Sequence, residues 1–151
     1  MIEQWSIPTW IFLHTLAERI SDKFMKENNE EVLNIIKTIC FILPCPTCRE
    51  HATYFIKRIH HNQVKTKEDL KSLLFFFHNK VNKRLGKRVY QNKNLSVYKN
   101  RRFDIITLNF LNAFSKKYNS RLLAGFISQN SKRKTETRRI SNWLKKNWKH
   151  F

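Results

Sequence analysis

The sequence predicts an all-α fold in which long helices are joined by short polar connections. The 151 residues include only 2 Gly and 3 Pro, too few for the many tight turns of an all-β fold or for a glycine-rich phosphate loop. Hydrophobic residues make up 41% of the chain, with 12 Phe and 4 Trp, so a single domain of this length can bury a core. Apolar residues recur three and four positions apart, which is the period of an amphipathic helix.

Two helices are predicted before the first cysteine pair. The first covers residues 8–26, with Ser6 as its N-cap and Pro8 in its first turn, where a missing N–H costs nothing. The second covers residues 30–42 and is ended by Pro44. Each has an apolar face at helical spacing.

Two further helices follow. The third is predicted over residues 46–60 and the fourth over residues 67–85. Thr66 with Asp69 three residues later resembles a capping box at the start of the fourth helix. Gly86 lies where a left-handed cap ends such a helix.

A fifth helix is predicted to begin at Ser96 and to end before Asn119. Residues 122–127 then form a short apolar patch, and residues 131–139 are expected to be polar, basic and solvated. Residues 139–151 are predicted to form an amphipathic basic helix, because apolar side chains alternate there with lysines at helical spacing.

The net charge of +19 is concentrated in the second part of the chain. Residues 1–90 hold 15 Lys and Arg against 9 Asp and Glu, a net charge of +6, whereas residues 91–151 hold 15 against 2, a net charge of +13. Three interpretations of this basic tail follow: its apolar face packs on the core or a partner, its cations bind nucleic acid phosphates, or it docks on an anionic membrane surface.

No run of eighteen apolar residues occurs, so no transmembrane helix is expected. The N-terminus has neither the basic nor the apolar region of a secretory signal. Three cysteines do not suggest the disulfide framework of a small secreted domain.

Cys45-Pro46-Thr47-Cys48 is a pair of thiols two residues apart at the predicted start of a helix. The positive end of a helix stabilises a thiolate and lowers its pKa, so this pair is suited to cycle between dithiol and disulfide. From the residues alone, a redox centre, half of a zinc site and two packed thiols all remain open.

The predicted fourth helix carries polar side chains that follow an apolar turn. His78 and Asn82 lie four residues apart and Asn79 and Asn82 three apart, so they share a face of the helix. A buried amide without a partner costs about 1–3 kcal/mol, and a bound polar cofactor would supply that partner. Lys83 and Lys87, one turn further on, are placed to meet phosphates.

Three motifs occur together in the order and spacing of a known family. They are Trp10 with His14 four residues later, the Cys45–Cys48 pair followed by His51, and the run formed by His78, Asn79, Val81, Asn82, Leu85 and Lys87, with Tyr90 beyond it. By these motifs the chain resembles the Erv/ALR family of FAD-linked thiol oxidases, especially its compact viral members. The resemblance covers about residues 5–90, or up to about residue 115 with the fifth helix.

The resemblance implies a four-helix bundle plus a short fifth helix that binds FAD without a covalent bond. It places an oxidase domain at residues 1–118 and a basic C-terminal helical extension at residues 119–151. Cys48 is expected to pass electrons to the flavin, while Cys45 exchanges with the substrate through a mixed disulfide. Reduced flavin then passes the electrons to oxygen, giving hydrogen peroxide, or to another acceptor. The predicted cofactor-binding residues are Trp10, His14, His51, His78, Asn79, Val81, Asn82, Lys83, Leu85, Lys87 and Tyr90.

Two features of the family are missing from the sequence. No second cysteine pair exists to shuttle electrons, and no cysteine follows Cys48 to close a disulfide onto the fifth helix. The CxxC pair is therefore expected to oxidise a thiol-bearing protein directly or through a thioredoxin-like shuttle protein. The resemblance also implies a homodimer. It places the protein in a viral disulfide pathway of the host cytoplasm or virion, with the mitochondrial intermembrane space or the cytosol as alternatives.

The residues also permit competing interpretations. A zinc site would use Cys45, Cys48 and His51 with a further histidine, but structural zinc sites usually combine two ligand pairs, and we predict no metal. Cys40 is expected to be a buried thiol, with a resolving role in the redox chemistry as the alternative. The competing class of function is a non-enzymatic basic module that binds nucleic acid or protein and carries a structural thiol pair.

Overall fold

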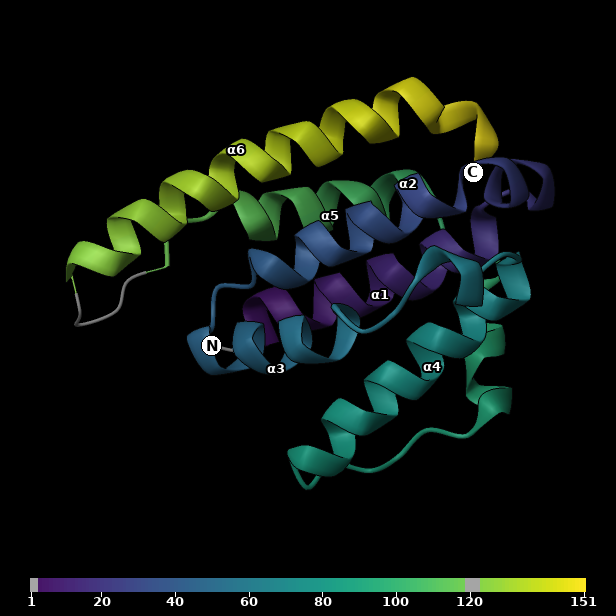
Figure 1. Cartoon of the computed structure of the whole chain (residues 1–151), viewed down its shortest axis with the longest axis horizontal. Helices are drawn as coiled ribbons and strands as arrows, with labels where there is room; N and C mark the ends of the chain where they lie inside the picture. Colours follow the sequence, from purple (N-terminus) through teal and green to yellow (C-terminus); the bar gives the residue numbers. More distant parts are fainter. Residues whose placement is uncertain (1–2, 119–122) are drawn as a thin grey trace.

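The computed structural model describes residues 3–118 and 123–151, and over these residues the protein is helical without a β-strand (Figure 1). The predicted all-α class is confirmed. The α-helices are α1 (Glu3–Arg19), α2 (Asp22–Phe41), α3 (Pro46–Ile56), α4 (Lys67–Arg84), α5 (Phe103–Ser115) and α6 (Leu123–Asn147). Three 3₁₀ segments join or end them: η1 (His61–Gln63), η2 (Asn92–Tyr98) and η3 (Trp148–His150).

Helix α1 is the centre of the fold. It packs against α5, α4 and η2, while α2 packs against α3 and α4 (Figure 1). Every residue from Phe12 to Ala17 is buried, so this part of α1 is covered on all sides rather than along one stripe. The helices around α1 can therefore bring their side chains to a shared site on it.

The predicted first helix is in fact two. Helix α1 ends at Arg19, and the Ser21 hydroxyl accepts a hydrogen bond from the Phe24 N–H (3.3 Å) as the N-cap of α2. Helix α2 then runs to Phe41 through a kink at Asn28, which has non-helical φ and ψ. The predicted second helix, residues 30–42, corresponds to the part of α2 after this kink, whereas the part before it was predicted to belong to the first helix.

Helix α4 confirms the predicted capping signals. The Thr66 hydroxyl accepts from the Asp69 N–H (3.1 Å), and the Asp69 carboxylate accepts from the Thr66 N–H (2.9 Å). The backbone N–H groups of Thr66 and Asp69 thus find their acceptors within four residues, and for this reason the sequence alone could predict the start of the helix. Gly86 has a φ of 65°, the left-handed conformation expected of it.

The third and fifth helices are shorter than predicted. Helix α3 ends at Ile56 rather than residue 60, and α5 begins at Phe103 rather than Ser96. Part of the segment between α4 and α5 forms η2, which packs against α1. This segment is therefore a wall of the site described below.

The last part of the chain forms one long helix, α6, where a solvated stretch at residues 131–139 and a short helix at residues 139–151 were predicted. Helix α6 packs against α5, and Ile140, Trp143 and Leu144 belong to the hydrophobic core. Arg133, expected in solvent, is 2% exposed, and its guanidinium donates to the Lys116 carbonyl (3.3 Å).

The division between residues 118 and 119 stays a prediction, because residues 119–122 lie outside the described part of the chain. The side chains of the apolar patch at residues 122–127 also lie outside it. Within the described ranges, no helix combines the length and the apolar character required to cross a membrane.

Candidate active site

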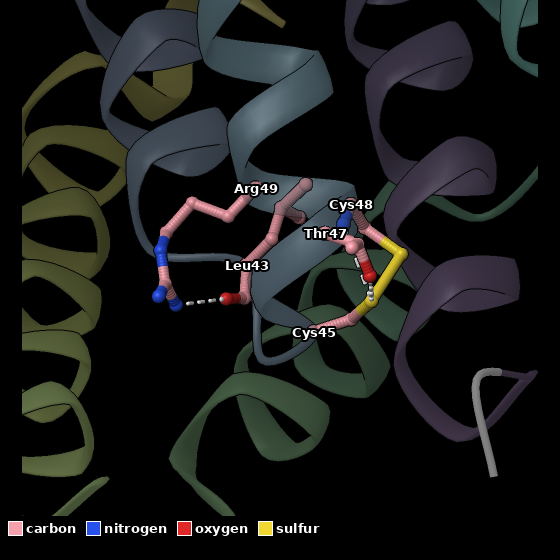
Figure 2. The surroundings of a disulfide bond; sticks show 5 residues. All are labelled: Leu43, Cys45, Thr47, Cys48 and Arg49. Atoms are coloured by element: carbon pink, nitrogen blue, oxygen red, sulfur yellow. Dashed lines mark hydrogen bonds between the residues drawn. A yellow bond between two sulfur atoms is a disulfide. The ribbon is translucent and has the colours of Figure 1, made fainter. Parts of the chain in front are cut away.

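The two cysteines of the CxxC motif form a disulfide at the start of α3 (Figure 2). Cys45 is the N-cap residue, and its Sγ accepts a hydrogen bond from the Cys48 N–H (3.2 Å). Pro46 occupies the first turn, as predicted. The positive end of α3 therefore points at the sulfur of Cys45, which stabilises it as a thiolate when the disulfide opens.

The turn that presents the disulfide is fixed by one side chain. The Arg49 guanidinium donates to the Leu43 carbonyl (3.0 Å), which ties α3 to the end of α2 across the turn (Figure 2). Both cysteines are half-buried against the core, whereas Pro46 and Thr47 are exposed. A partner can therefore approach over Pro46 and Thr47 without displacing core residues.

A second cluster lies between α1, α4 and η2. The Trp10 ring stacks on the His78 ring, with centroids 3.9 Å apart and planes 3° from parallel. His14 Nε2 lies 3.0 Å from His78 Nδ1, and the Tyr98 ring stacks on His14 at 4.9 Å. Because one imidazole must donate and the other accept, these two nitrogens hold opposite protonation states within a neutral pair.

Burial keeps both histidines uncharged. It lowers the pKa of His14 to about 4. It also lowers the pKa of His78 to about 3, with smaller contributions from the Coulombic interactions of His78 with His14 and with Lys87. A histidine in unfolded protein titrates near pH 6.5. At neutral pH the cluster is therefore a stacked, uncharged surface suited to an aromatic ring.

These pKa values predict an acid-labile fold. Below pH 6.5 the unfolded chain takes up protons that folded His14 and His78 do not, so each can remove up to about 1.4 kcal/mol of stability per pH unit until its folded pKa is reached. We expect the free energy of unfolding of the flavin-free protein to fall between pH 6.5 and 4.5 in urea titrations. In the His14→Gln/His78→Gln variant the free energy of unfolding should depend much less on pH over this range. If its pH dependence is unchanged, other groups cause the loss of stability.

A cavity of about 250 Å³ opens beside this cluster. It is lined by His14, Phe75, His78, Asn79, Tyr90, Asn94, Leu95, Val97 and Tyr98. Two larger grooves, of about 730 Å³ between α2 and α6 and about 670 Å³ between α1 and α5, lie elsewhere and contain none of the predicted site residues. The smallest of these three spaces is thus the one lined by predicted cofactor-binding residues.

Asn79 has a structural partner that the sequence did not indicate. Its Nδ2 donates to the Tyr90 carbonyl (3.0 Å), and its Oδ1 accepts from the Tyr90 N–H (2.8 Å). The side chain thereby fixes the segment after α4 over the cavity. Its contribution is to shape the wall, because both ends of its amide are already paired.

Asn82 does not line this cavity, but its amide is free to take a ligand. It is 5% exposed, and its Nδ2 has no hydrogen-bond partner among the described residues. Leaving such a donor unpaired costs about 1–3 kcal/mol, which an acceptor on a bound group would recover. This orphaned donor on α4, the helix that carries His78, is the observation that best fits a polar aromatic cofactor.

The remaining predicted residues lie at different depths. Val81 is half-buried against the core. Lys83, in the last turn of α4, is exposed, as are Leu85 and Lys87 just after the helix. His51 is exposed on α3 and is not brought to the cavity. Lys83 and Lys87 place positive charge outside the cavity, where phosphates of a bound dinucleotide would remain in water.

An aromatic chain connects the helix of the disulfide with the cluster. Phe55, seven residues after Cys48 on α3, stacks on Phe77 of α4 with centroids 4.4 Å apart. Phe77 in turn meets the edge of Trp10 at 5.3 Å. Sequence analysis missed Phe55 and Tyr98 as site residues, although the spacing of Phe55 from Cys48, two turns on one helix face, was a readable signal.

The third cysteine is not part of the site. Cys40 is a free thiol, 2% exposed, and burial raises its pKa to about 12. A thiol that stays protonated is a poor nucleophile, so this finding agrees with the predicted buried thiol and disfavours the resolving role. In the part of the chain that the structure describes, no three His, Cys, Asp or Glu side chains gather in a group able to hold a metal ion.

Comparison with known proteins gives a consistent result. Residues 7–104 match the model of the Erv1 / Alr family. An African swine fever virus protein named FAD-linked sulfhydryl oxidase is 33% identical over 96 residues, which are 64% of this chain and 77% of the relative. The FAD-linked sulfhydryl oxidases ERV1 of Arabidopsis thaliana and of rice are 32% and 28% identical over 82 residues, 54% of this chain and 42% of each relative. The chain thus spans less than half of these plant proteins. No solved structure matches it significantly.

Proposed function

The chain belongs to the Erv1 / Alr family, and we propose that it is an FAD-dependent thiol oxidase that forms disulfide bonds in partner proteins. The relatives named as FAD-linked sulfhydryl oxidases support both the cofactor and the activity. The observation that carries the proposal is the Cys45–Cys48 disulfide at the N-terminus of α3, on the helix whose Phe55 leads to the Trp10–His78 stack.

The disulfide supplies the exchange chemistry. A thiolate of the substrate attacks Cys45 Sγ, the Cys45–Cys48 bond breaks, and Cys48 leaves with the electron pair. A second substrate thiolate then attacks the substrate sulfur of this mixed disulfide. The substrate disulfide forms, and Cys45 leaves as a thiolate that the Cys48 N–H and the end of α3 stabilise. Two electrons from the substrate now rest on the cysteine pair.

Several residues of the cluster would hold the cofactor. Trp10, His14 and His78 offer a stacked uncharged surface, Asn82 offers a buried donor, and Lys87 offers charge for phosphate. FAD, when bound, supplies the two-electron acceptor that returns the cysteine pair to a disulfide, with oxygen as the final acceptor and hydrogen peroxide as the product.

Oxygen consumption by the purified protein tests this proposal. With dithiothreitol as substrate, we expect one molecule of hydrogen peroxide for each disulfide formed, because both carry two electrons. Catalase should return half of the oxygen consumed. A protein that oxidises dithiols without consuming oxygen would retain the thiol chemistry but remove oxygen as the acceptor. A protein that does neither would refute the oxidase.

The partner is proposed to be a protein thiol. The exposed turn at Pro46 and Thr47, beside Cys45, is where either the substrate or a thioredoxin-like shuttle protein would meet the disulfide. Arg49 anchors this turn by donating to the Leu43 carbonyl, so the disulfide is held in place for the exchange.

A further inference from the structure

Helix α6 presents an exposed surface with two separate rows of cations that the oxidase chemistry does not use. We call it the α6 basic face. It consists of the exposed side chains of Lys132, Lys134, Arg138, Arg139, Lys145 and Lys146. At 100° per residue, Lys134, Arg138 and Lys145 fall in one row along the helix, and Lys132, Arg139 and Lys146 fall in a second. The rows are about 16 and 21 Å long at 1.5 Å per residue.

The opposite face of α6 is fully engaged. Thr137, Ile140, Trp143 and Leu144 are buried in the core, and Trp143 is only 8% exposed. An amphipathic helix that docks on a membrane inserts its apolar face, and here that face is covered by α5 and the core. What α6 can offer a partner is therefore its charge.

Most cations of this face have no ion pair, although Arg139 borders the groove that Glu27, Glu30 and Glu31 of α2 also line. Glu136 is the only acidic residue after Asp104, and it pairs with Arg139 at 3.2 Å. The other five cations of the face have no ion pair with a described residue. Lys134 and Arg138 lie one helical turn apart, where like charges repel each other, and a row of anions would relieve that repulsion.

We propose that the α6 basic face binds the phosphate backbone of nucleic acid, without sequence preference. Duplex DNA carries one negative charge per about 1.7 Å of axis, so a row of about 16 Å faces several phosphates at once. The face contains no aromatic residue, and the nearby Trp148 ring stacks on Phe103 at 5.2 Å. Contacts should therefore go to phosphates rather than to bases.

A set of matched charge variants tests the proposal. Lys134→Gln/Arg138→Gln/Lys145→Gln removes one row of the face. Lys57→Gln/Lys65→Gln/Lys80→Gln removes the same charge from exposed positions on and near α3 and α4. Binding of a fluorescent 20-base-pair DNA duplex to the full chain is followed by anisotropy between 50 and 200 mM salt, with circular dichroism to confirm that each variant folds.

The α6 variant should bind at least about tenfold more weakly at 50 mM salt, and its slope of log affinity against log salt should shrink by about 3, or 0.9 per lost phosphate contact. The control variant should change the affinity by less than about threefold. Equal losses in both variants would assign binding to net charge and overturn the proposal. So would binding to phosphatidylserine vesicles that exceeds binding to the duplex. The assay needs no flavin or turnover, so its outcome is separate from that of the oxidase.

Discussion

Replacing Cys48 by serine should abolish turnover of dithiols, with oxygen consumption reduced to the rate of protein-free buffer. A lone Cys45 thiolate can still attack a disulfide and form a mixed disulfide, but it cannot accept the two electrons that a Cys45–Cys48 disulfide accepts. Oxygen-electrode rates for wild-type and Cys48→Ser protein at equal flavin content measure the effect. Retained activity would show that the CxxC pair is not the redox centre.

The two cysteines should differ in what they trap. In Cys48→Ser, Cys45 remains at the exposed end of α3 and should displace thionitrobenzoate from a thioredoxin-like protein that keeps only one cysteine, labelled as the thionitrobenzoate disulfide. The resulting mixed disulfide has no second thiol to resolve it and should be visible as a shifted band on a non-reducing gel. In Cys45→Ser this band should be weaker, because we expect Cys45 rather than Cys48 to exchange with the partner. The reverse pattern would exchange the roles of the two sulfurs.

Cys40→Ser serves as the matched control for both experiments. Because Cys40 is buried and its pKa is raised to about 12, we expect wild-type turnover from this variant once it has folded. Loss of activity with normal flavin content would give Cys40 the resolving role that its burial argues against.

The second large effect is expected at Asn82. Asn82→Leu removes the buried Nδ2 that lacks a partner, so the flavin-free protein should unfold at the same or a higher temperature. The same change removes a donor to the cofactor, and FAD should bind about 10- to 100-fold more weakly, corresponding to about 1.4–2.7 kcal/mol. Thermal melts of the flavin-free protein and FAD titrations measure the two effects separately.

Thr107→Val is the control for Asn82→Leu, which is expected to keep or raise stability while weakening FAD binding. Thr107 also has a buried polar atom without a described partner, but it lies on α5, which carries none of the predicted cofactor-binding residues. Its replacement should leave FAD affinity unchanged. If Asn82→Leu keeps its FAD affinity as well, the orphaned amide is not a cofactor contact.

Local chemistry explains which features the sequence revealed. Thr66 starts α4 and Gly86 ends it because each acts on backbone groups within a few residues. Ser21 followed by an acidic residue was an equally local signal for a helix start, but the apolar spacing continued across it and suggested one helix. Periodicity alone does not register a single capped break.

Other features depend on how distant segments meet. Asn79 pairs with the Tyr90 backbone eleven residues away, and Tyr98 stacks on His14 of α1. Neither follows from a residue pattern, because each partner is chosen by the path of the loop after α4. Residues 131–139 were expected in solvent because of their charge. Arg133 is nevertheless buried, and its guanidinium donates a hydrogen bond to the Lys116 carbonyl.

An anaerobic titration of the purified protein with dithiothreitol is the most direct test of electron flow from Cys45 and Cys48 to bound FAD. We expect a yellow protein with stoichiometric FAD that loses its visible absorbance as the dithiol is added and regains it when air is admitted. Cys48→Ser protein should bind FAD but stay yellow over the same time. A colourless protein with bound zinc, or equally fast bleaching of the Cys48→Ser variant, would contradict the proposed route.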